Sequence, residues 1–262
     1  MPRVFATGDM HGWDGSRWKL DEEHFPVGYR ELCKDDVVIV TGDMAAVFFC
    51  DAAEPLDLDR CAPWEREYRE WLESRPWTWA FVDGNHENHD ALAALPVGEW
   101  RGGAVHRVFP SVIHLMRGQS YSLPLGKGEE TTEVSVFAMG GARSVDRYRR
   151  TEGRSWWPSE LPGYDEIDAA EATLDSLGWD VDLVLTHAQP VEVAVAATGM
   201  WEWQNESDRL ASWLGYVRDR LSYRLWLSGH LHVDASALGG RDRVLFDDVL
   251  ELTPCDFARD GM

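Results

Sequence analysis

Five short apolar runs in this chain each lead directly into a polar loop that carries Asp, Asn or His beside glycine. The runs are residues 4–7, 37–41, 77–82, 183–185 and 225–227. Short buried strands that alternate with helical patterns are typical of an α/β fold with a mostly parallel or mixed sheet. Ligands bind beyond the carboxyl ends of strands in such sheets, so five loops of this kind can converge on one site.

The five loops offer seven oxygen or imidazole ligands and no sulfur ligand. They are Asp9, His11, Asp43, Asn85, His187, His230 and His232. Such a set suits Mn²⁺, Fe, Zn²⁺ or Co²⁺ rather than a soft metal or an iron–sulfur cluster. The pairs Asp9/His11 and His230/His232 are two residues apart, so in an extended segment both side chains of a pair lie on one side. Seven ligands are too many for one tetrahedral zinc ion and match two divalent ions that share a carboxylate.

Each signal has a plain structural alternative when it stands alone. An Asp-x-His sequence also arises by chance or in a capped turn, and a lone His187 would be a hydrogen-bonded core histidine. Gly84-Asn85-His86-Glu87 alone would be a turn with left-handed residues. The combination differs because five of the nine histidines belong to it, each following a predicted strand. We therefore interpret the combination as a metal site.

The rest of the chain shows no repeat, low-complexity tract or linker that would divide it. Helical periodicity covers residues 64–74, 166–177 and 207–221, residues 105–139 resemble a β-meander with a hairpin tip at 126–130, and residues 243–252 form one or two strands. A length of 262 residues fits one large domain. We therefore expect a single domain over residues 1–262.

The charge of the chain limits its partners. Its 46 acidic and 25 basic residues give a formal net charge of −21, which argues against binding extended nucleic acid or an anionic membrane through a broad basic face. No run of about 18 apolar residues is present, so no transmembrane helix is expected. Four cysteines without a CxxC pair indicate reduced thiols and a cytoplasmic protein.

The ordered motifs resemble those of the calcineurin-like metallophosphoesterase family. They are Gly8-Asp9-x-His11-Gly12, Gly42-Asp43, Gly84-Asn85-His86-Glu87, His187 and Gly229-His230-x-His232, and they span residues 8–232. The resemblance implies a four-layer α/β/β/α sandwich, with two mixed sheets and a dinuclear metal site at the carboxyl ends of the strands. It also implies that Asp9, His11, Asp43 and His232 hold one ion, and that Asp43, Asn85, His187 and His230 hold the other, with Asp43 as the bridge.

One motif departs from two branches of that family. Phosphoprotein phosphatases and dinucleoside tetraphosphatases carry GDxxDRG or GDxxxRG, whereas this chain has Gly42-Asp43-Met44-Ala45-Ala46-Val47-Phe48. The aspartate expected beside the catalytic histidine and the phosphate-binding arginine are both missing from this segment. The departure weakens an assignment to either branch and leaves the seven metal ligands intact.

The expected activity is hydrolysis of a small phosphomonoester or phosphodiester. Two divalent ions, Mn²⁺ before Fe, Zn²⁺ or Co²⁺, would bridge a hydroxide that attacks phosphorus in line. His86 would face the leaving group as a proton donor, the alternative being a structural hydrogen bond behind its loop. Phosphoprotein or dinucleoside polyphosphate hydrolysis is the second enzymatic hypothesis. A metal-free scaffold of the same fold is the non-enzymatic one, and it expects missing ligands.

An arginine-rich segment follows the meander. Five arginines lie within residues 143–154, and Arg147 and Arg150 would face the same way if the segment were helical. Guanidinium groups match phosphate oxygens, so we expect Arg147 and Arg150 to bind substrate, the alternative being a solvated loop. The next residues, Trp156 and Trp157, would either stack on an aromatic leaving group or anchor the segment to the core.

Overall fold

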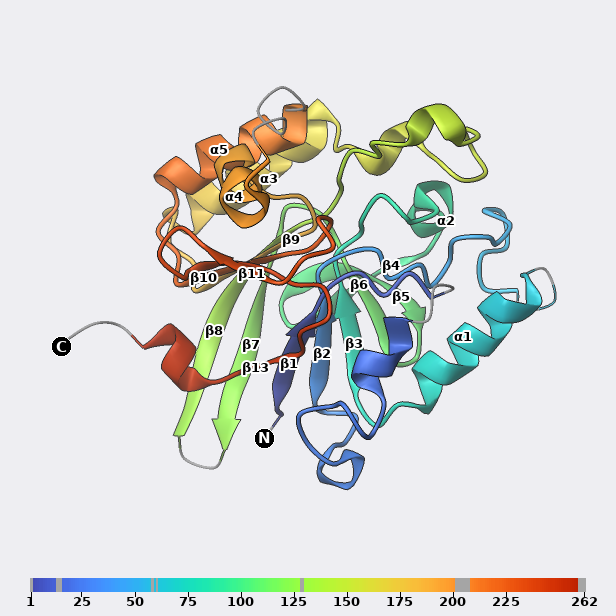
Figure 1. Ribbon diagram of the computed structural model, residues 1–262, viewed down its shortest axis with the longest axis horizontal. Coiled ribbons are helices and arrows are strands. Elements are labelled where there is room, and N and C mark those ends of the chain that lie inside the picture. The colour runs from blue at the N-terminus through green and yellow to red at the C-terminus, as the bar shows by residue number, and fades with distance from the viewer. Residues whose placement is uncertain are drawn as a thin grey trace.

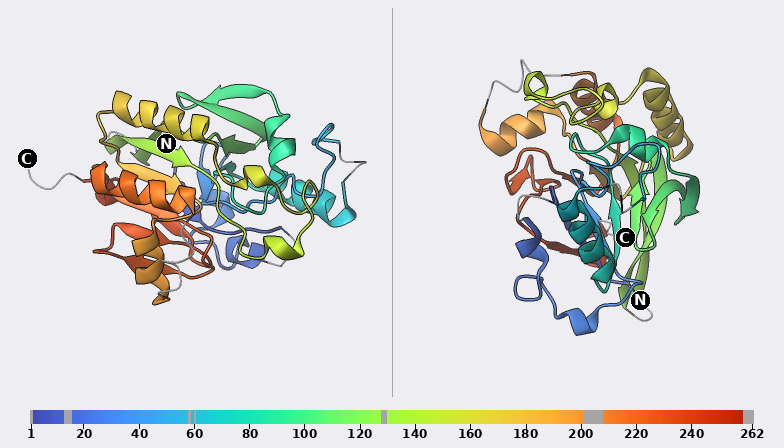
Figure 2. Two further views of the ribbon diagram at one scale, coloured as in Figure 1. Left: turned by 90° about the horizontal axis from the view of Figure 1, so that it is seen from above. Right: turned by 90° about the vertical axis from the view of Figure 1, so that its right-hand side faces the viewer.

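The computed structural model describes residues 2–12, 16–57, 59, 61–127, 130–200 and 208–258. Two mixed sheets lie face to face at its centre, and helices cover their outer faces (Figures 1 and 2). The four-layer α/β/β/α arrangement expected from the sequence is confirmed. In the described residues, no helix combines the length and the apolar character that a membrane span requires.

The first sheet has seven strands, and its central strands β1, β2, β3 and β6 are parallel. Its order is β13 (Leu250–Leu252), β1 (Val4–Thr7), β2 (Val37–Val40), β3 (Thr78–Phe81), β6 (Val112–Leu115), β5 (Gly103–Phe109) and β4 (Val97–Trp100). The strand β13 from the tail of the chain pairs antiparallel with β1. The two ends of the described chain therefore complete the same sheet.

The second sheet has six strands, of which β8, β9, β10 and β12 are parallel. Its order is β11 (Ala235–Ala237), β12 (Asp242–Val244), β10 (Leu225–Ser228), β9 (Leu183–Thr186), β8 (Glu130–Met139) and β7 (Gln119–Lys127). The long hairpin of β7 and β8 forms one edge. Residues 128 and 129 of the expected hairpin tip lie outside the described residues.

The helices are α1 (Pro63–Ser74), α2 (His89–Ala93), α3 (Tyr164–Ser176), α4 (Val191–Thr198) and α5 (Arg209–Arg220). Short 3₁₀ turns occupy Ser16–Leu20, Tyr29–Glu31, Arg147–Arg149, Pro158–Glu160 and Pro254–Phe257. The helix α1 lies against the first sheet, whereas α3 and α5 lie against the second (Figure 1). The start of the helix expected at residues 207–221 includes residue 207, which lies outside the described residues.

Alternation along the strands decides which side chains fill which layer. On β1, Val4 and Ala6 point into the core between the sheets, and Phe5 points to the outer layer, where Tyr68 and Leu72 of α1 pack. Side chains at successive positions of a strand face opposite ways, so one short run serves two apolar layers. Such strands are apolar throughout, as strands buried on both faces must be.

Two features of the fold differ from the sequence-based expectation. The segment 105–139 is not one meander, because β5 and β6 join the first sheet and β7 and β8 join the second. The chain thus crosses between the sheets after β6. The helix α4 and the strand β4 were not expected, since α4 is short and rich in β-branched valine, and β4 is largely exposed with a glycine in its four residues.

Candidate active site

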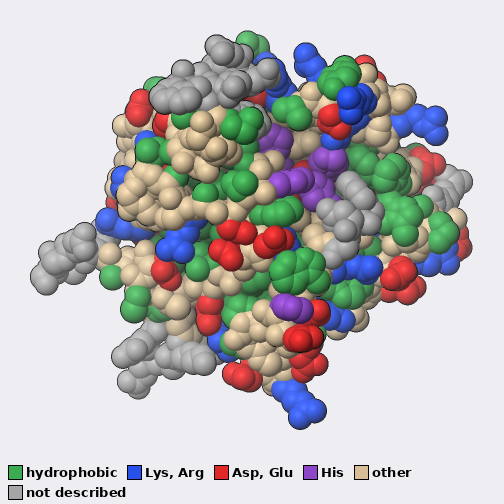
Figure 3. All heavy atoms as spheres, in the orientation of Figure 1, with side chains coloured by type: hydrophobic (Ala, Val, Ile, Leu, Met, Phe, Trp, Pro, Cys, Tyr) green, Lys and Arg blue, Asp and Glu red, His purple; other side chains and the backbone are tan. Residues whose placement is uncertain are grey.

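The side chains expected to bind metal lie at the carboxyl ends of five strands. Those of Asp9 and His11 follow β1, Asp43 follows β2 and Asn85 follows β3 in the first sheet. In the second sheet, His187 follows β9, and His230 and His232 follow β10. Histidine side chains gather in a hollow of the surface on this face, between basic and hydrophobic side chains (Figure 3). The site therefore spans the ends of both sheets.

Four of the expected ligands form a compact group. One ligand atom from each of Asp9, His11, Asp43 and His232 lies within 4.8 Å of the others. The Nε2 atoms of His11 and His232 are 3.0 Å apart, and His11 Nε2 is 3.7 Å from Asp9 Oδ1 and 3.8 Å from Asp43 Oδ2. Three of these residues are buried, whereas 49% of the His232 side chain is exposed. The group is thus open to solvent on the His232 side.

The other oxygen of Asp43 faces a second group. Asp43 Oδ1 lies 3.3 Å from His187 Nε2, which in turn lies 3.3 Å from Asn85 Oδ1. The His230 ring packs edge-on against the His187 ring, with 5.0 Å between centroids. His187 Nδ1 lies 2.7 Å from the backbone oxygen of Thr41, so an N–H at Nδ1 leaves Nε2 as the atom turned to the site. Asp43 thus stands between the two groups.

The backbone at the site adopts a conformation that ordinary residues avoid. The φ angles are +44° at Asp9, +49° at His11, +50° at Asp43, +68° at His230 and +52° at His232. Left-handed non-glycine residues are uncommon and cost about 1–3 kcal/mol each, and they cluster at functional sites. Five of the seven expected ligands share this feature, which directs their side chains inward from tight turns.

A glycine next to the site permits the close approach of the two sheets. A Cβ atom on Gly42 would overlap the imidazole of His187, and Gly42 itself has a φ of +98°. Residues other than glycine rarely adopt this φ, and position 42 has no room for a side chain. The Gly-Asp sequence therefore has a steric reason beyond the aspartate itself.

The ionisable groups of the site shift one another's pKa values. Burial opposes ionisation of Asp43, but the imidazoles of His187, His86 and His11 hold its pKa well below the usual range. Burial likewise opposes protonation of His187, but the Asp43 carboxylate outweighs it and raises the pKa of His187 to about 9. The pKa of His230 falls to about 3 because of burial and the neighbouring His187 charge. A carboxylate among several imidazoles suits a cation.

His86 lies beside both groups of expected ligands, and Arg150 of the arginine-rich segment approaches it. Its ring is 4.8 Å from that of His11, and its backbone N–H donates to Asp43 Oδ1 at 2.7 Å. Arg150 Nη2 is 2.8 Å from His86 Nε2, and Arg150 Nε pairs with Asp146 at 2.7 Å. Burial lowers the pKa of His86 to about 4. The Asp43 carboxylate raises this pKa, and the positive charge of Arg150 lowers it.

The arginine-rich segment is not helical enough to bring both expected arginines to the site. Arg147 begins a 3₁₀ turn and is exposed, and no ion pair to it is found among the described residues, whereas Arg150 ends the turn and points at His86. Trp157 is buried with Phe48, and its Nε1 donates to Asp90 at 3.1 Å. Trp157 therefore anchors the segment to the core, which was one of the two alternatives.

A chain of hydrogen bonds holds Asn85 in position. Asn85 Nδ2 donates to Ser144 Oγ at 3.2 Å, and Ser144 donates from both Oγ and the backbone to the Glu160 carboxylate. Because Nδ2 is used in this way, Oδ1 is the atom left facing His187. The arginine-rich segment, which contains Ser144, thus positions the expected ligand Asn85 as well as approaching His86.

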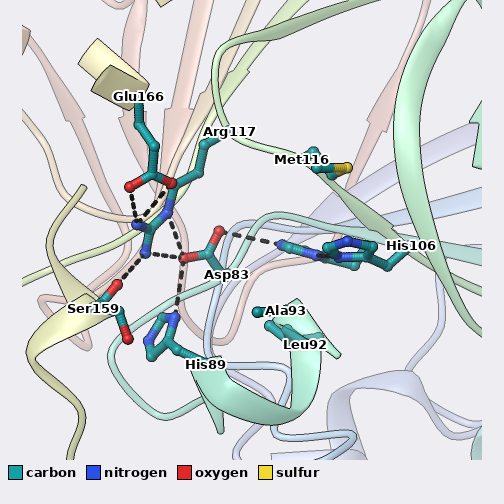
Figure 4. Close-up of a pocket in the computed structure, with 10 residues that line it drawn as sticks. Asp83, His89, Leu92, Ala93, His106, Met116, Arg117, Ser159 and Glu166 are labelled. Carbon is teal, nitrogen blue, oxygen red and sulfur yellow. Dashed lines mark hydrogen bonds and ion pairs between the residues drawn. The ribbon is translucent and has the colours of Figure 1, made fainter. Parts of the chain in front are cut away.

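A second buried polar cluster lies behind Asn85 and was not found from the sequence. Asp83 pairs with Arg117 at 2.6 Å and with His114 at 3.2 Å, and the Nδ1 atom of His89 is 3.7 Å from it (Figure 4). Burial opposes ionisation of Asp83, but Arg117 and His114 hold its pKa far below the usual range. Arg117 also donates to the backbone oxygens of residues 159 and 160. The cluster therefore ties the end of β3 to the 3₁₀ turn Pro158–Glu160.

Comparisons with known proteins identify the family of the chain. The profile of the calcineurin-like phosphoesterase family matches residues 2–234. No curated protein matches significantly. Among solved structures, the phosphopantetheinyl hydrolase of Mycobacterium tuberculosis has a TM-score of 0.50 and 16% identity, over 100% of this chain and 93% of that chain. A putative 5'-nucleotidase of Staphylococcus aureus, in complex with α-ketoglutarate, has a TM-score of 0.43 and 12% identity, over 93% of this chain and 48% of that chain.

At 16% identity, the likeness to the phosphopantetheinyl hydrolase supports the fold and nothing finer. The family match carries more, because it covers residues 2–234 of a 262-residue chain and includes all five loops of the site. The chain belongs to the calcineurin-like phosphoesterase family and is a phosphoric ester hydrolase.

Proposed function

We propose that the protein hydrolyses small phosphomonoesters or phosphodiesters and that the reaction requires two divalent metal ions. The observation that carries the proposal is the position of Asp43 between two groups of expected ligands. One of its oxygens lies 3.8 Å from His11 Nε2 in the compact group, and the other lies 3.3 Å from His187 Nε2. We further propose that residues 1–262 act as one domain, since the strand β13 pairs with β1 and so joins the tail to the first sheet.

The residues present fit two divalent ions. The nitrogen atoms of His11 and His232 converge to 3.0 Å beside two carboxylates, an arrangement that a shared cation would satisfy. In the proposed assignment, one ion is held by Asp9, His11, Asp43 and His232, and the other by Asp43, Asn85, His187 and His230. Oxygen and imidazole donors favour Mn²⁺, with Fe, Zn²⁺ and Co²⁺ as the alternatives. Two such ions supply positive charge to the phosphoryl oxygens and acidify water for attack in line with the leaving group.

His86 and Arg150 are the residues that we propose act on the substrate. An arginine is always a donor, so His86 Nε2 accepts from Arg150 in the substrate-free protein. A phosphoryl oxygen is a stronger acceptor than a neutral imidazole and would draw the guanidinium away. The anionic phosphoryl group also raises the affinity of His86 for a proton. His86 can then donate that proton to the leaving alkoxide.

The net charge of the protein and the guanidinium of Arg150 support a small anionic substrate. The net charge of −21 repels long polyanions, whereas Arg150 offers one local guanidinium to a small one. Phosphoprotein or dinucleoside polyphosphate hydrolysis remains the second candidate, and residues 42–48 lack the arginine of those branches. A metal-free scaffold is disfavoured because each of the seven ligands is present.

A metal analysis combined with an ester screen tests the proposal. The purified protein is expected to bind two metal equivalents and to hydrolyse nitrophenyl monoesters or diesters when Mn²⁺ is added. A chelator should abolish turnover, and the metal ions should restore it. Hydrolysis that is unaffected by removal of all metal, or a protein that binds no metal and cleaves no ester, would refute the proposed function.

A further inference from the structure

A cavity of about 440 Å³ opens beside His86 and is unlike the rest of the site in being largely apolar. Its lining residues are Phe48, Phe49, Trp64, His86, Asp146, Arg150 and Ser155. The volume lies in the range typical of small-molecule pockets. His86 and Arg150 belong both to this cavity and to the proposed catalytic group, so a ligand in the cavity reaches the site of the reaction.

Aromatic rings form one side of the cavity. The Phe48 and Phe49 rings meet edge to face with 4.6 Å between centroids, and Phe49 meets Trp64 in the same way at 5.3 Å. Phe49 is 47% exposed despite its size. Large aromatic side chains left partly open at a pocket offer flat faces, on which another ring gains stacking energy beyond its burial.

These rings are held by a rigid base rather than by a loose loop. Arg69 and Glu65 of α1 form a fully buried ion pair at 2.8 Å, and Arg69 donates to the backbone oxygen of Ala46 at 3.0 Å. Tyr68 on the same helix donates to the backbone oxygen of Met44 at 2.9 Å. The helix that carries Trp64 therefore also fixes the segment that carries Phe48 and Phe49. A pocket formed in advance loses little entropy when a ligand binds.

The opposite side of the cavity is charged. Arg150 is held over it by Asp146 at 2.7 Å and donates to His86 at 2.8 Å. An anion bound at Arg150 and a ring lying on Phe49 and Trp64 would be the two ends of one ligand. This combination suits an ester whose phosphoryl group lies at the histidines and whose alcohol carries an aromatic ring.

We propose that this cavity binds the leaving alcohol of the substrate and that the alcohol carries a planar aromatic ring. The inference rests on the proposed function, because it takes His86 to face the leaving group. Phe49 and Trp64 would then determine specificity, while Arg150 joins the ring pocket to the phosphoryl group.

The first test compares three phosphomonoesters, 2-phenylethyl, 2-cyclohexylethyl and ethyl phosphate, whose leaving alcohols are similar in acidity. We expect the phenylethyl ester to have a kcat/KM at least tenfold above that of the cyclohexylethyl ester, equivalent to about 1.4 kcal/mol. The ethyl ester should be the poorest substrate. Adenosine 5'-monophosphate is a fourth substrate, and its kcat/KM compared with that of the phenylethyl ester shows whether the cavity prefers a nucleobase or a simple aryl ring.

Variants of Phe49 and Trp64 test whether the cavity causes the preference. Phe49→Leu keeps an apolar side chain and removes the ring, and Trp64→Ala removes the neighbouring ring. Both should reduce the ratio of kcat/KM for the phenylethyl ester to that for the cyclohexylethyl ester to threefold or less. Tyr148→Ala is the matched control, because Tyr148 is a 76% exposed aromatic residue that does not line the cavity. It should keep the full preference.

Binding measured by calorimetry provides a readout that needs no turnover. The non-hydrolysable 3-phenylpropylphosphonate should bind at least tenfold more tightly than propylphosphonate, and Phe49→Leu should remove most of the difference. Equal kcat/KM values for all esters, equal preference for phenyl and cyclohexyl rings, or a preference that survives both variants would overturn the inference and leave the proposed function standing. If neither monoesters nor diesters are hydrolysed, the proposed function fails and the leaving-group assignment fails with it. The phosphonate binding then shows only whether the cavity accepts an aromatic ring.

Discussion

Replacing Asp43 with Asn tests the centre of the site with the smallest possible change. Asp43 is buried, and its two oxygens face the His187 and His11 sides at 3.3 and 3.8 Å. The amide has the same shape as the carboxylate but removes the charge that both metal-ligand groups share. We expect Asp43→Asn to lose at least one of the two metal equivalents and most of the turnover.

The same substitution has a calculable effect in the metal-free protein. Mainly because of Asp43, the pKa of His187 is raised from 6.5 to about 9, which corresponds to about 3 kcal/mol of stabilisation. A raised pKa stabilises the folded state fully below pH 6.5, and the contribution is lost as the pH rises through about 9. Chelated Asp43→Asn should therefore unfold about 3 kcal/mol more easily than the chelated parent near pH 6, and the difference should shrink towards pH 10.

Urea unfolding in the presence of a chelator measures this difference, and metal analysis of the purified variant measures the first effect. Asp36→Asn is a matched control, because Asp36 is also buried and accepts backbone hydrogen bonds from residues 3 and 33, far from the histidines. It should keep both metal equivalents. Two retained equivalents with near-normal turnover in Asp43→Asn would refute the bridging role, and a stability difference independent of pH would refute the pairing with His187.

Four further predictions concern the residues around this centre. Arg150→Ala should raise KM at least tenfold for a substrate with a second anionic group, whereas the exposed Arg147→Ala should change it less than twofold in the same steady-state assay. His86→Ala should slow hydrolysis of alkyl esters by about 10²–10⁴, slow that of nitrophenyl esters far less and leave the metal content unchanged. Arg117→Met leaves the buried Asp83 charge without its closest partner and should lower the free energy of unfolding in urea by about 3–5 kcal/mol. Because the pKa of Asp83 is lowered in the folded protein, its contribution is present above about pH 4 and is lost as the pH falls, so Asp83→Asn should be less sensitive to acid than the parent.

The convergence of the expected ligand side chains could be predicted from the sequence because it depends on strand ends and local motifs. Buried strands such as β1, expected at residues 4–7 and found there, fix where each loop begins. The ends of parallel strands share an edge of the sheet, so Asp9, Asp43 and Asn85 had to lie near one another once the strands were recognised. In the second sheet, β9 and β10 are also parallel, so His187 and His230 lie close together at their carboxyl ends.

The partners of His86 could not be predicted because they depend on packing between segments that no local pattern joins. Arg150 and His86 are 64 residues apart, and the side chain of Arg150 is aimed by Asp146 at the end of a 3₁₀ turn rather than by a helix. The aromatic cavity needs Phe49 and Trp64 from a loop and a helix. Apolar residues at such positions are as common in ordinary cores, so only their partial exposure in the folded protein distinguishes them.

The strain at the site must be opposed by contacts within the protein itself. Five left-handed residues cost several kilocalories per mole together, and the loops that contain them hold one another. The backbone oxygen of Asp43 accepts from the N–H groups of both Met10 and His11, at 3.1 and 2.8 Å, and the N–H of His230 donates to Asp9 at 3.0 Å. A turn from one sheet is thus fixed by a turn from the other. The site is consequently shaped by the packing of the two sheets.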